Sequence, residues 1–178
     1  MKIADLLLGS SFFALLSLVA GCQRDAPAVA QPPGDVVFAR AGVVLTVGPN
    51  WKRIDRDPGA PVCPPTLVGE GGQVRTILFD ADRSDPEIAA NILSATIQAA
   101  TRASKEAFHR EEFAADGGLK GIHLRYELRL EKDAPETRTH NYIFKNREGR
   151  CVSVSYIVPS KSESEAVHEM IRKTLKLK

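Results

Sequence analysis

The chain has 178 residues and a formal net charge of +2 at pH 7, and 43% of its residues are hydrophobic and 6% aromatic. Positive and negative residues are interspersed without a basic block, which argues against a nucleic-acid-binding protein. The aromatic residues are too few for a surface on which single-stranded bases stack. The three cysteines are an odd number, so at least one of them has no partner within the chain.

The chain begins with a segment typical of an export signal. Lys2 supplies a positive charge, and residues 6–20 form an apolar run of about 15 residues, shorter than the ~20 that a membrane-spanning helix needs. The apolar residues would cover every face of a helix, which does not suit the surface of a folded domain. The sequence therefore predicts a signal peptide over residues 1–21.

The apolar run ends in Val19-Ala20-Gly21-Cys22, which resembles the lipobox of bacterial lipoproteins. The resemblance implies that Cys22 becomes the first residue of the mature protein and carries acyl chains. Two or three such chains hold a protein firmly to a bilayer, whereas one chain holds it marginally. Gln23 follows in place of the aspartate that retains lipoproteins at the inner membrane. We therefore expect a membrane-anchored lipoprotein of the bacterial cell envelope that faces the periplasm, with the outer membrane favoured.

Residues 22–35 are rich in proline and alanine and show no apolar period. This composition is typical of an extended, semi-rigid linker. The chain after the signal peptide has about 157 residues, which is enough for one hydrophobic core. We expect a lipid-anchored linker over residues 22–35 and one folded domain over residues 36–178.

Cys63 and Cys151 remain if Cys22 is acylated. An even pair in an exported protein favours a disulfide between them. The alternative is a reactive thiol at Cys151. That residue lies in a strand-like segment, and no helix N-terminus or fixed base is evident that would lower its pKa, so the disulfide is favoured.

The sequence of the first half of the domain predicts short strands followed by a long helix. Strands are expected at residues 36–39, 43–47, 66–68 and 74–82. The helix is expected over residues 84–108, with Ser84 or Asp85 as its cap and Pro86 in its first turn. The stripe expected to face a sheet comprises Ile88, Ile92, Ala95, Ala99 and Ala103, flanked by Leu93, Ile97 and Ala100.

The second half predicts an antiparallel meander and a closing helix. Residues 122–131 alternate apolar and polar side chains, with His123 on the polar face, and two further strands are expected within residues 137–146 and 150–159. The final helix should turn Val167, Met170 and Ile171 inward. The order of elements predicts an α+β domain, an antiparallel β-sheet with helices packed on it.

These elements resemble the PsbP-like fold, which includes DcrB-like bacterial lipoproteins. The resemblance is carried by "GVVLTVGPNWKRI", the aromatic-rich "HNYIFKNREGRCVSVSYIV" and the closing "MIRKTLKLK". It covers residues 36–178 and implies an α/β/α sandwich. Its members are mostly non-enzymatic and bind or steady larger assemblies, so it implies a fold and no catalytic site.

The four histidines do not indicate a metal site. His109, His123, His140 and His168 have no HxH or HxxxH spacing, and no CxxC pair is present, so neither a metal nor another cofactor is expected. If the two strands pair around the loop at Asp133, His123 lies beyond the partner of His140, and the two should not meet. His109 and His168 are expected near helix surfaces. Ser153 and Ser155 are expected to be strand-face hydroxyls rather than nucleophiles.

The sequence therefore favours a lipid-anchored, non-catalytic interaction or accessory module of the bacterial cell envelope, with an unknown protein partner and no nucleic acid. The alternative is a periplasmic carrier or sensor of a small apolar ligand, held between sheet and helix. An enzyme that uses Cys151 or a histidine is less favoured.

Overall fold

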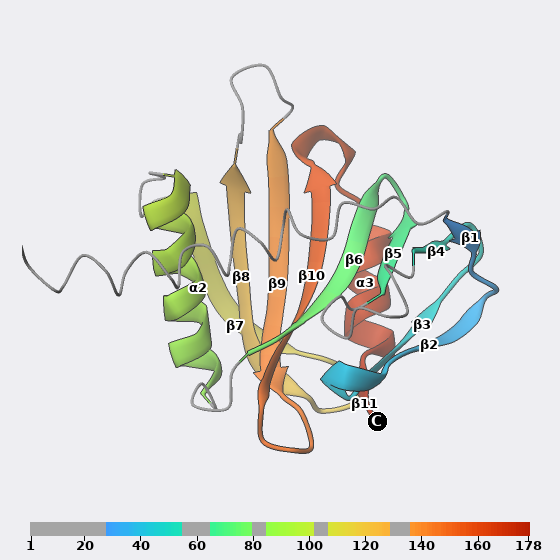
Figure 1. Cartoon of the computed structure of the whole chain (residues 1–178), viewed down its shortest axis with the longest axis horizontal. Helices are drawn as coiled ribbons and strands as arrows, with labels where there is room; N and C mark the ends of the chain where they lie inside the picture. Colours follow the sequence, from blue (N-terminus) through green and yellow to red (C-terminus); the bar gives the residue numbers. More distant parts are fainter. Residues whose placement is uncertain (1–27, 55–64, 80–84, 102–106, 129–135) are drawn as a thin grey trace, which may run out of the picture.

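The computed structural model describes residues 28–54, 65–79, 85–101, 107–128 and 136–178. The signal peptide, Cys22, Cys63 and Ser84 lie outside these residues. Two antiparallel sheets and two α-helices make up the described fold (Figure 1). Among the described residues, no helix has both the length and the apolar character needed to cross a membrane.

The larger sheet has eight strands in the order β1-β4-β5-β6-β10-β9-β8-β7. Their bounds are β1 Val29–Ala30, β4 Lys52–Ile54, β5 Thr66–Gly69, β6 Gly72–Leu78, β7 Phe108–Ala114, β8 Lys120–Leu128, β9 Thr137–Lys145 and β10 Cys151–Pro159. The predicted meander is confirmed, because β8 pairs with β9 and β9 with β10 along nearly their whole lengths. The sheet continues from β10 to β6, so strands from both halves of the chain form one layer.

The smaller sheet has the order β11-β3-β2 and joins the two ends of the domain. Its bounds are β2 Gly34–Phe38, β3 Val43–Val47 and β11 Lys176–Leu177. A 3₁₀ turn, η1 (Ala39–Ala41), connects β2 to β3. β1 pairs with β4, so part of the segment predicted as linker belongs to a sheet and the folded part begins before Val36.

Both faces of the larger sheet are covered. α2 (Pro86–Thr101) lies on one face, and α3 (Glu165–Thr174) and the smaller sheet lie on the other (Figure 1). The core under α2 includes Ala89, Ala90, Ile122, Leu124, Tyr126, Ile143 and Cys151. The core under α3 includes Tyr142, Phe144, Val152, Val154, Tyr156, Val167 and Ile171. The predicted α+β sandwich is confirmed, and the two central strands β9 and β10 are buried over most of their lengths.

α2 begins where the sequence predicts, because Oδ1 of Asp85 accepts the backbone N–H of Glu87 at 2.8 Å. The predicted end at Phe108 is wrong. The described part of the helix spans Pro86–Thr101, and Phe108 is the first residue of edge strand β7.

The predicted inward stripe of α2 is also wrong. Ile88 is 51% exposed, and Ala95 and Ala99 are exposed as well. The sheet is contacted by Ala89 and Ala90, both fully buried, together with Leu93 and Ile97. Because the helix is apolar on nearly every face, its periodicity does not select the buried side.

Candidate functional site

Three of the four histidines gather on the face of the larger sheet that α3 covers. His123 on β8, His140 on β9 and His168 on α3 are 8%, 2% and 4% exposed. The rings of His140 and His168 meet edge to face with centroids 4.4 Å apart, and His123 stacks on His140 at 5.2 Å. We call these residues, with Glu163, the histidine cluster.

The prediction that His123 and His140 do not meet is wrong. Arg125 is the direct partner of His140, and Tyr142 is the direct partner of His123, so the two histidines are diagonal neighbours on adjacent strands. Side chains at such positions are still within reach when they are large. Nε2 of His123 lies 3.0 Å from Nδ1 of His140.

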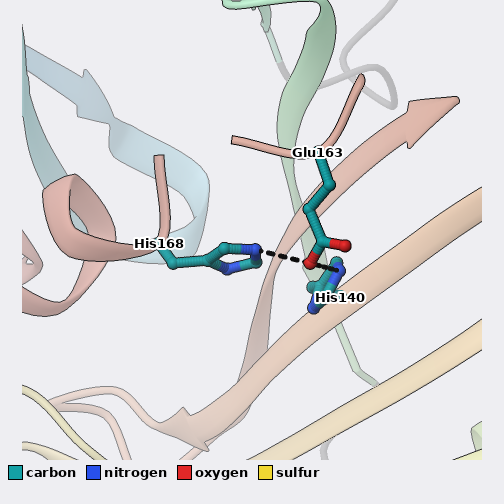
Figure 2. A group of neighbouring side chains, drawn as sticks. All are labelled: His140, Glu163 and His168. Carbon is teal, nitrogen blue, oxygen red and sulfur yellow. Dashed lines mark hydrogen bonds and ion pairs between the residues drawn. The ribbon is translucent and has the colours of Figure 1, made fainter. Parts of the chain in front are cut away.

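Glu163 lies in the connector between the 3₁₀ turn η3 (Ser160–Ser162) and α3, and its side chain is 23% exposed. Oε1 of Glu163 is 3.0 Å from Nε2 of His168 and 3.0 Å from Nε2 of His140 (Figure 2). Only the contact with His168 has hydrogen-bond geometry. Nε2 of His140 is buried and makes no hydrogen bond in the part of the chain that the structure describes.

A second layer of polar contacts surrounds the histidine cluster. Oε1 of Glu111, on β7, lies 2.7 Å from Nδ1 of His123. The hydroxyl of Tyr142 lies 2.5 Å from Nδ1 of His168. The guanidinium of Arg138 contacts Oε2 of Glu163, which leaves Oε1 to the two histidines.

Burial sets the charge of the imidazoles. Burial, together with the neighbouring His168, lowers the pKa of His140 to about 3. Burial also lowers the pKa of His123, although its hydrogen bond to Glu111 acts in the other direction. His123 and His140 are therefore neutral at pH 7.

The two carboxylates are ionised at neutral pH. Burial works against ionisation of Glu163, but the hydrogen bond from Arg138 and the neighbouring histidines outweigh it and hold its pKa below the usual value. The hydrogen bond with His123 lowers the pKa of Glu111. The cluster thus places the neutral imidazole of His140 beside a Glu163 carboxylate that is held negative.

The fold brings together ligand atoms that the sequence spacing does not. One nitrogen each of His140 and His168 and an oxygen of Glu163 all lie within 4.8 Å of one another. They come from β9, from the connector and from α3, so no short motif contains them. Residues of this kind bind divalent transition metals in proteins.

Comparisons with known proteins identify the fold alone. No family model matches the sequence, and no curated protein matches it. The solution structure of cyanobacterial PsbP (CyanoP) from Synechocystis sp. PCC 6803 superposes with a TM-score of 0.51 at 11% identity, over 88% of this chain and 99% of that chain. The chain has a PsbP-like fold.

A second solved structure agrees with this assignment. A crystal structure from Bacteroides thetaiotaomicron VPI-5482 superposes with a TM-score of 0.52 at 10% identity and covers 83% of this chain. This chain spans 49% of that one, about half its length. Both identities are low enough that only the PsbP-like fold carries over.

The remaining predicted site residues lie apart from the histidine cluster. Cys151 is buried under α2 and has no disulfide partner among the described residues, and burial raises the pKa of its thiol, which does not suit a nucleophile. The predicted pairing with Cys63 is not confirmed, because Cys63 lies outside the described residues. His109 is exposed on strand β7, and His168 is buried on α3 rather than on a helix surface.

Ser153 and Ser155 are strand-face hydroxyls, as predicted. Both are buried on β10, and the hydroxyl of Ser155 donates to Oδ1 of Asn141 at 2.7 Å. Neither serine has a histidine among its recorded hydrogen-bond partners.

A groove of about 520 Å³ lies at one end of the strands β5, β6, β9 and β10. Its lining is mostly apolar and includes Val68, Gln73, Ile157 and Pro159. The volume falls within the range of small-molecule sites. The groove lies along strand ends, whereas the sequence predicts a ligand between sheet and helix.

Proposed function

We propose that this protein is a lipid-anchored, non-catalytic accessory module of the bacterial cell envelope, facing the periplasm and favouring the outer membrane. The observation that carries the proposal is the apolar run that ends in Val19-Ala20-Gly21-Cys22, immediately upstream of a PsbP-like domain. Acyl chains on Cys22 anchor the protein, since each buried CH₂ contributes about 0.8 kcal/mol.

In this proposal the tether between Cys22 and the folded domain is shorter than the linker predicted over residues 22–35. β1 begins at Val29, so residues 23–28 alone separate Cys22 from the first strand. A fully extended segment of six residues reaches roughly 20 Å, at about 3.3 Å per residue. The domain therefore stands close to the bilayer surface, where a membrane-bound partner can reach it.

Replacement of Cys22 tests the anchor. The Cys22→Ser variant should leave the membrane fraction and lose incorporation of a labelled fatty acid. Cys63→Ser is the matched control, because it removes a cysteine that follows no apolar run, and it should stay in the membrane fraction and keep the label. Membrane retention and labelling of Cys22→Ser at the level of the unmodified chain would refute the anchor.

The accessory role predicts a stable protein partner. The unmodified chain, solubilised gently from its own membrane after mild crosslinking, should co-purify with a partner in defined proportion. The released Cys22→Ser variant should recover less of it, because anchoring concentrates both proteins on one surface. Recovery of free protein alone under several mild conditions would contradict the accessory role.

The groove supports a second candidate function, a carrier of a small apolar ligand. Its mostly apolar lining and its volume suit such a ligand. Native mass spectrometry of the detergent-released chain should then show an added mass beyond that of the acyl chains. A mass explained by polypeptide and acyl chains alone would remove this candidate.

A further inference from the structure

We propose that His140, Glu163 and His168 form a binding site for one divalent transition-metal ion, for which zinc is the reference metal. This inference is independent of the membrane anchor and of the partner. The ligands are Nε2 of His140, Oε1 of Glu163 and Nε2 of His168, which point toward one another from three elements (Figure 2).

The separations of these atoms suit a tetrahedral ion. Ligands about 2.1 Å from zinc are roughly 3.3 Å from one another in tetrahedral geometry. Oε1 of Glu163 is already 3.0 Å from each imidazole nitrogen, and all three atoms lie within 4.8 Å. Small side-chain rotations thus complete three corners of the tetrahedron and leave the fourth for water.

The hydrogen bonds around His140 leave a place for a cation. Glu111 is a carboxylate and can only accept, so Nδ1 of His123 carries the proton between them. The neutral ring of His123 then accepts at Nε2, and Nδ1 of His140 donates to it. Nε2 of His140 is left as a lone pair that faces Oε1 of Glu163. A metal ion between these two acceptors replaces a repulsive contact with two bonds.

His168 can present a lone pair in the same direction. Its Nδ1 lies 2.5 Å from the hydroxyl of Tyr142, which can donate or accept. When Nδ1 donates to the hydroxyl oxygen, Nε2 has no proton and can bind the metal. In the metal-free arrangement Nε2 donates its proton to Oε1 of Glu163, and Nδ1 accepts from the hydroxyl. Transfer of the ring proton from Nε2 to Nδ1, with rotation of the hydroxyl hydrogen away from Nδ1, gives the ligating tautomer.

Outer contacts already hold each ligand in place. His140 is backed by His123 and through it by Glu111, and His168 is backed by Tyr142. Such partners orient metal-binding imidazoles and raise their basicity. Arg138 holds the other oxygen of Glu163, which fixes the carboxylate but reduces its attraction for a cation.

The ligand set selects the class of metal. Two imidazoles and one carboxylate suit zinc and its transition-metal neighbours, whereas magnesium and calcium prefer sites made only of oxygen. The bound ion would tie β9 to the connector and α3, which are consecutive in the chain and meet β9 only through tertiary structure. It would therefore stabilise the docking of α3 on the sheet.

The test uses the full chain in detergent, stripped of metal with a chelator and then titrated with zinc chloride. We expect saturable binding of one zinc ion per chain, a raised melting temperature, and no such effect from magnesium. X-ray absorption of the zinc-loaded chain should show nitrogen and oxygen neighbours. Sulfur neighbours would place the metal on the cysteines and overturn the site, as would the absence of saturable binding.

Two variants and one control assign the site. His168→Gln and Glu163→Gln each remove one ligand, and each should weaken zinc binding beyond the about 10- to 100-fold that loss of an outer partner costs. His109→Gln removes an exposed histidine from β7 and should bind zinc like the unmodified chain. Unchanged affinity in folded Glu163→Gln, which changes only a partly exposed connector residue, would overturn the proposal even if His168→Gln fails to fold.

Discussion

His123 and His140 lie one diagonal step apart on neighbouring strands, and their nitrogens Nε2 and Nδ1 are 3.0 Å apart in the buried interior. Burial lowers the pKa of both rings, so each takes up a proton at a lower pH than free histidine does, and His140, with a pKa of about 3, stays neutral furthest into acid. This contact makes the stability of the domain depend on pH.

We predict that the metal-free protein loses stability as the pH falls below about 6.5. There the unfolded chain protonates its histidines while folded His140, with a pKa of about 3, does not, so the unfolded state binds more protons. The free energy of unfolding should therefore fall with decreasing pH by up to about 1.4 kcal/mol per pH unit for each such histidine. Denaturant unfolding at several pH values, with a chelator present, measures this slope.

The charged groups around the histidines add to the effect at lower pH. The pKa values of Glu111 and Glu163 are also lowered, so their contribution is present above about pH 4.5 and is lost below it. His140→Gln should reduce the slope between pH 6.5 and 5, and His109→Gln should leave it unchanged. A free energy of unfolding that stays constant between pH 7 and 5 would show that the buried histidines are not held neutral.

The orientation of α2 can be tested with one substitution at two positions. Ile97→Ala removes side-chain atoms packed against the sheet core and should lower the free energy of unfolding by about 2 kcal/mol. Ile88→Ala changes a residue that is 51% exposed and should stay within about 0.5 kcal/mol of the unmodified chain. If denaturant unfolding showed a larger loss of unfolding free energy for Ile88→Ala than for Ile97→Ala, α2 would face the sheet with the stripe predicted from the sequence.

At Gly121 on β8, an added methyl group would clash with the backbone of the neighbouring strand β9. A Cβ there would lie 2.0 Å from the carbonyl oxygen of Ile143 on β9, so the two strands would have to separate. We expect Gly121→Ala to cost at least about 2 kcal/mol in thermal or denaturant unfolding. Gly48→Ala is the matched control, because nothing lies within 4 Å of its Cβ. Equal stability of the two variants would contradict the observed approach of β8 to β9.

The state of Cys151 follows from its burial under α2. The thiol has no disulfide partner among the described residues and burial raises its pKa, so iodoacetamide should not modify it in the native protein. Denaturant without a reductant should make it reactive, as peptide mass mapping would show. Modification only after reduction would instead establish the disulfide with Cys63 that the sequence favours.

The sequence predicts the fold better than the site because the two depend on different information. Alternation along β8 and the caps of α2 are local signals, and they predict a meander and a helix start that the structure confirms. Strand β7 is the last strand of the larger sheet. Its charged residues lie on both faces of the sheet, so its sequence lacks that alternation.

The histidine cluster depends on register and on docking, which no single segment encodes. The polar face of β8 predicts either solvent or a polar cover around His123, and α3 and the smaller sheet cover that face. Glu163 and His168 reach His140 from the far end of the chain. Two signals in the sequence point toward the cluster: His123 and His140 lie on adjacent predicted strands, and His168 directly follows the inward-facing Val167 in the last helix.

The most direct test of the proposed function is the intact mass of the chain extracted with detergent from bacterial membranes. We predict a polypeptide that begins at Cys22 and carries the added mass of two or three acyl chains. A chain that begins at Met1, or one that begins at Cys22 with an unmodified thiol and amine, would contradict the account.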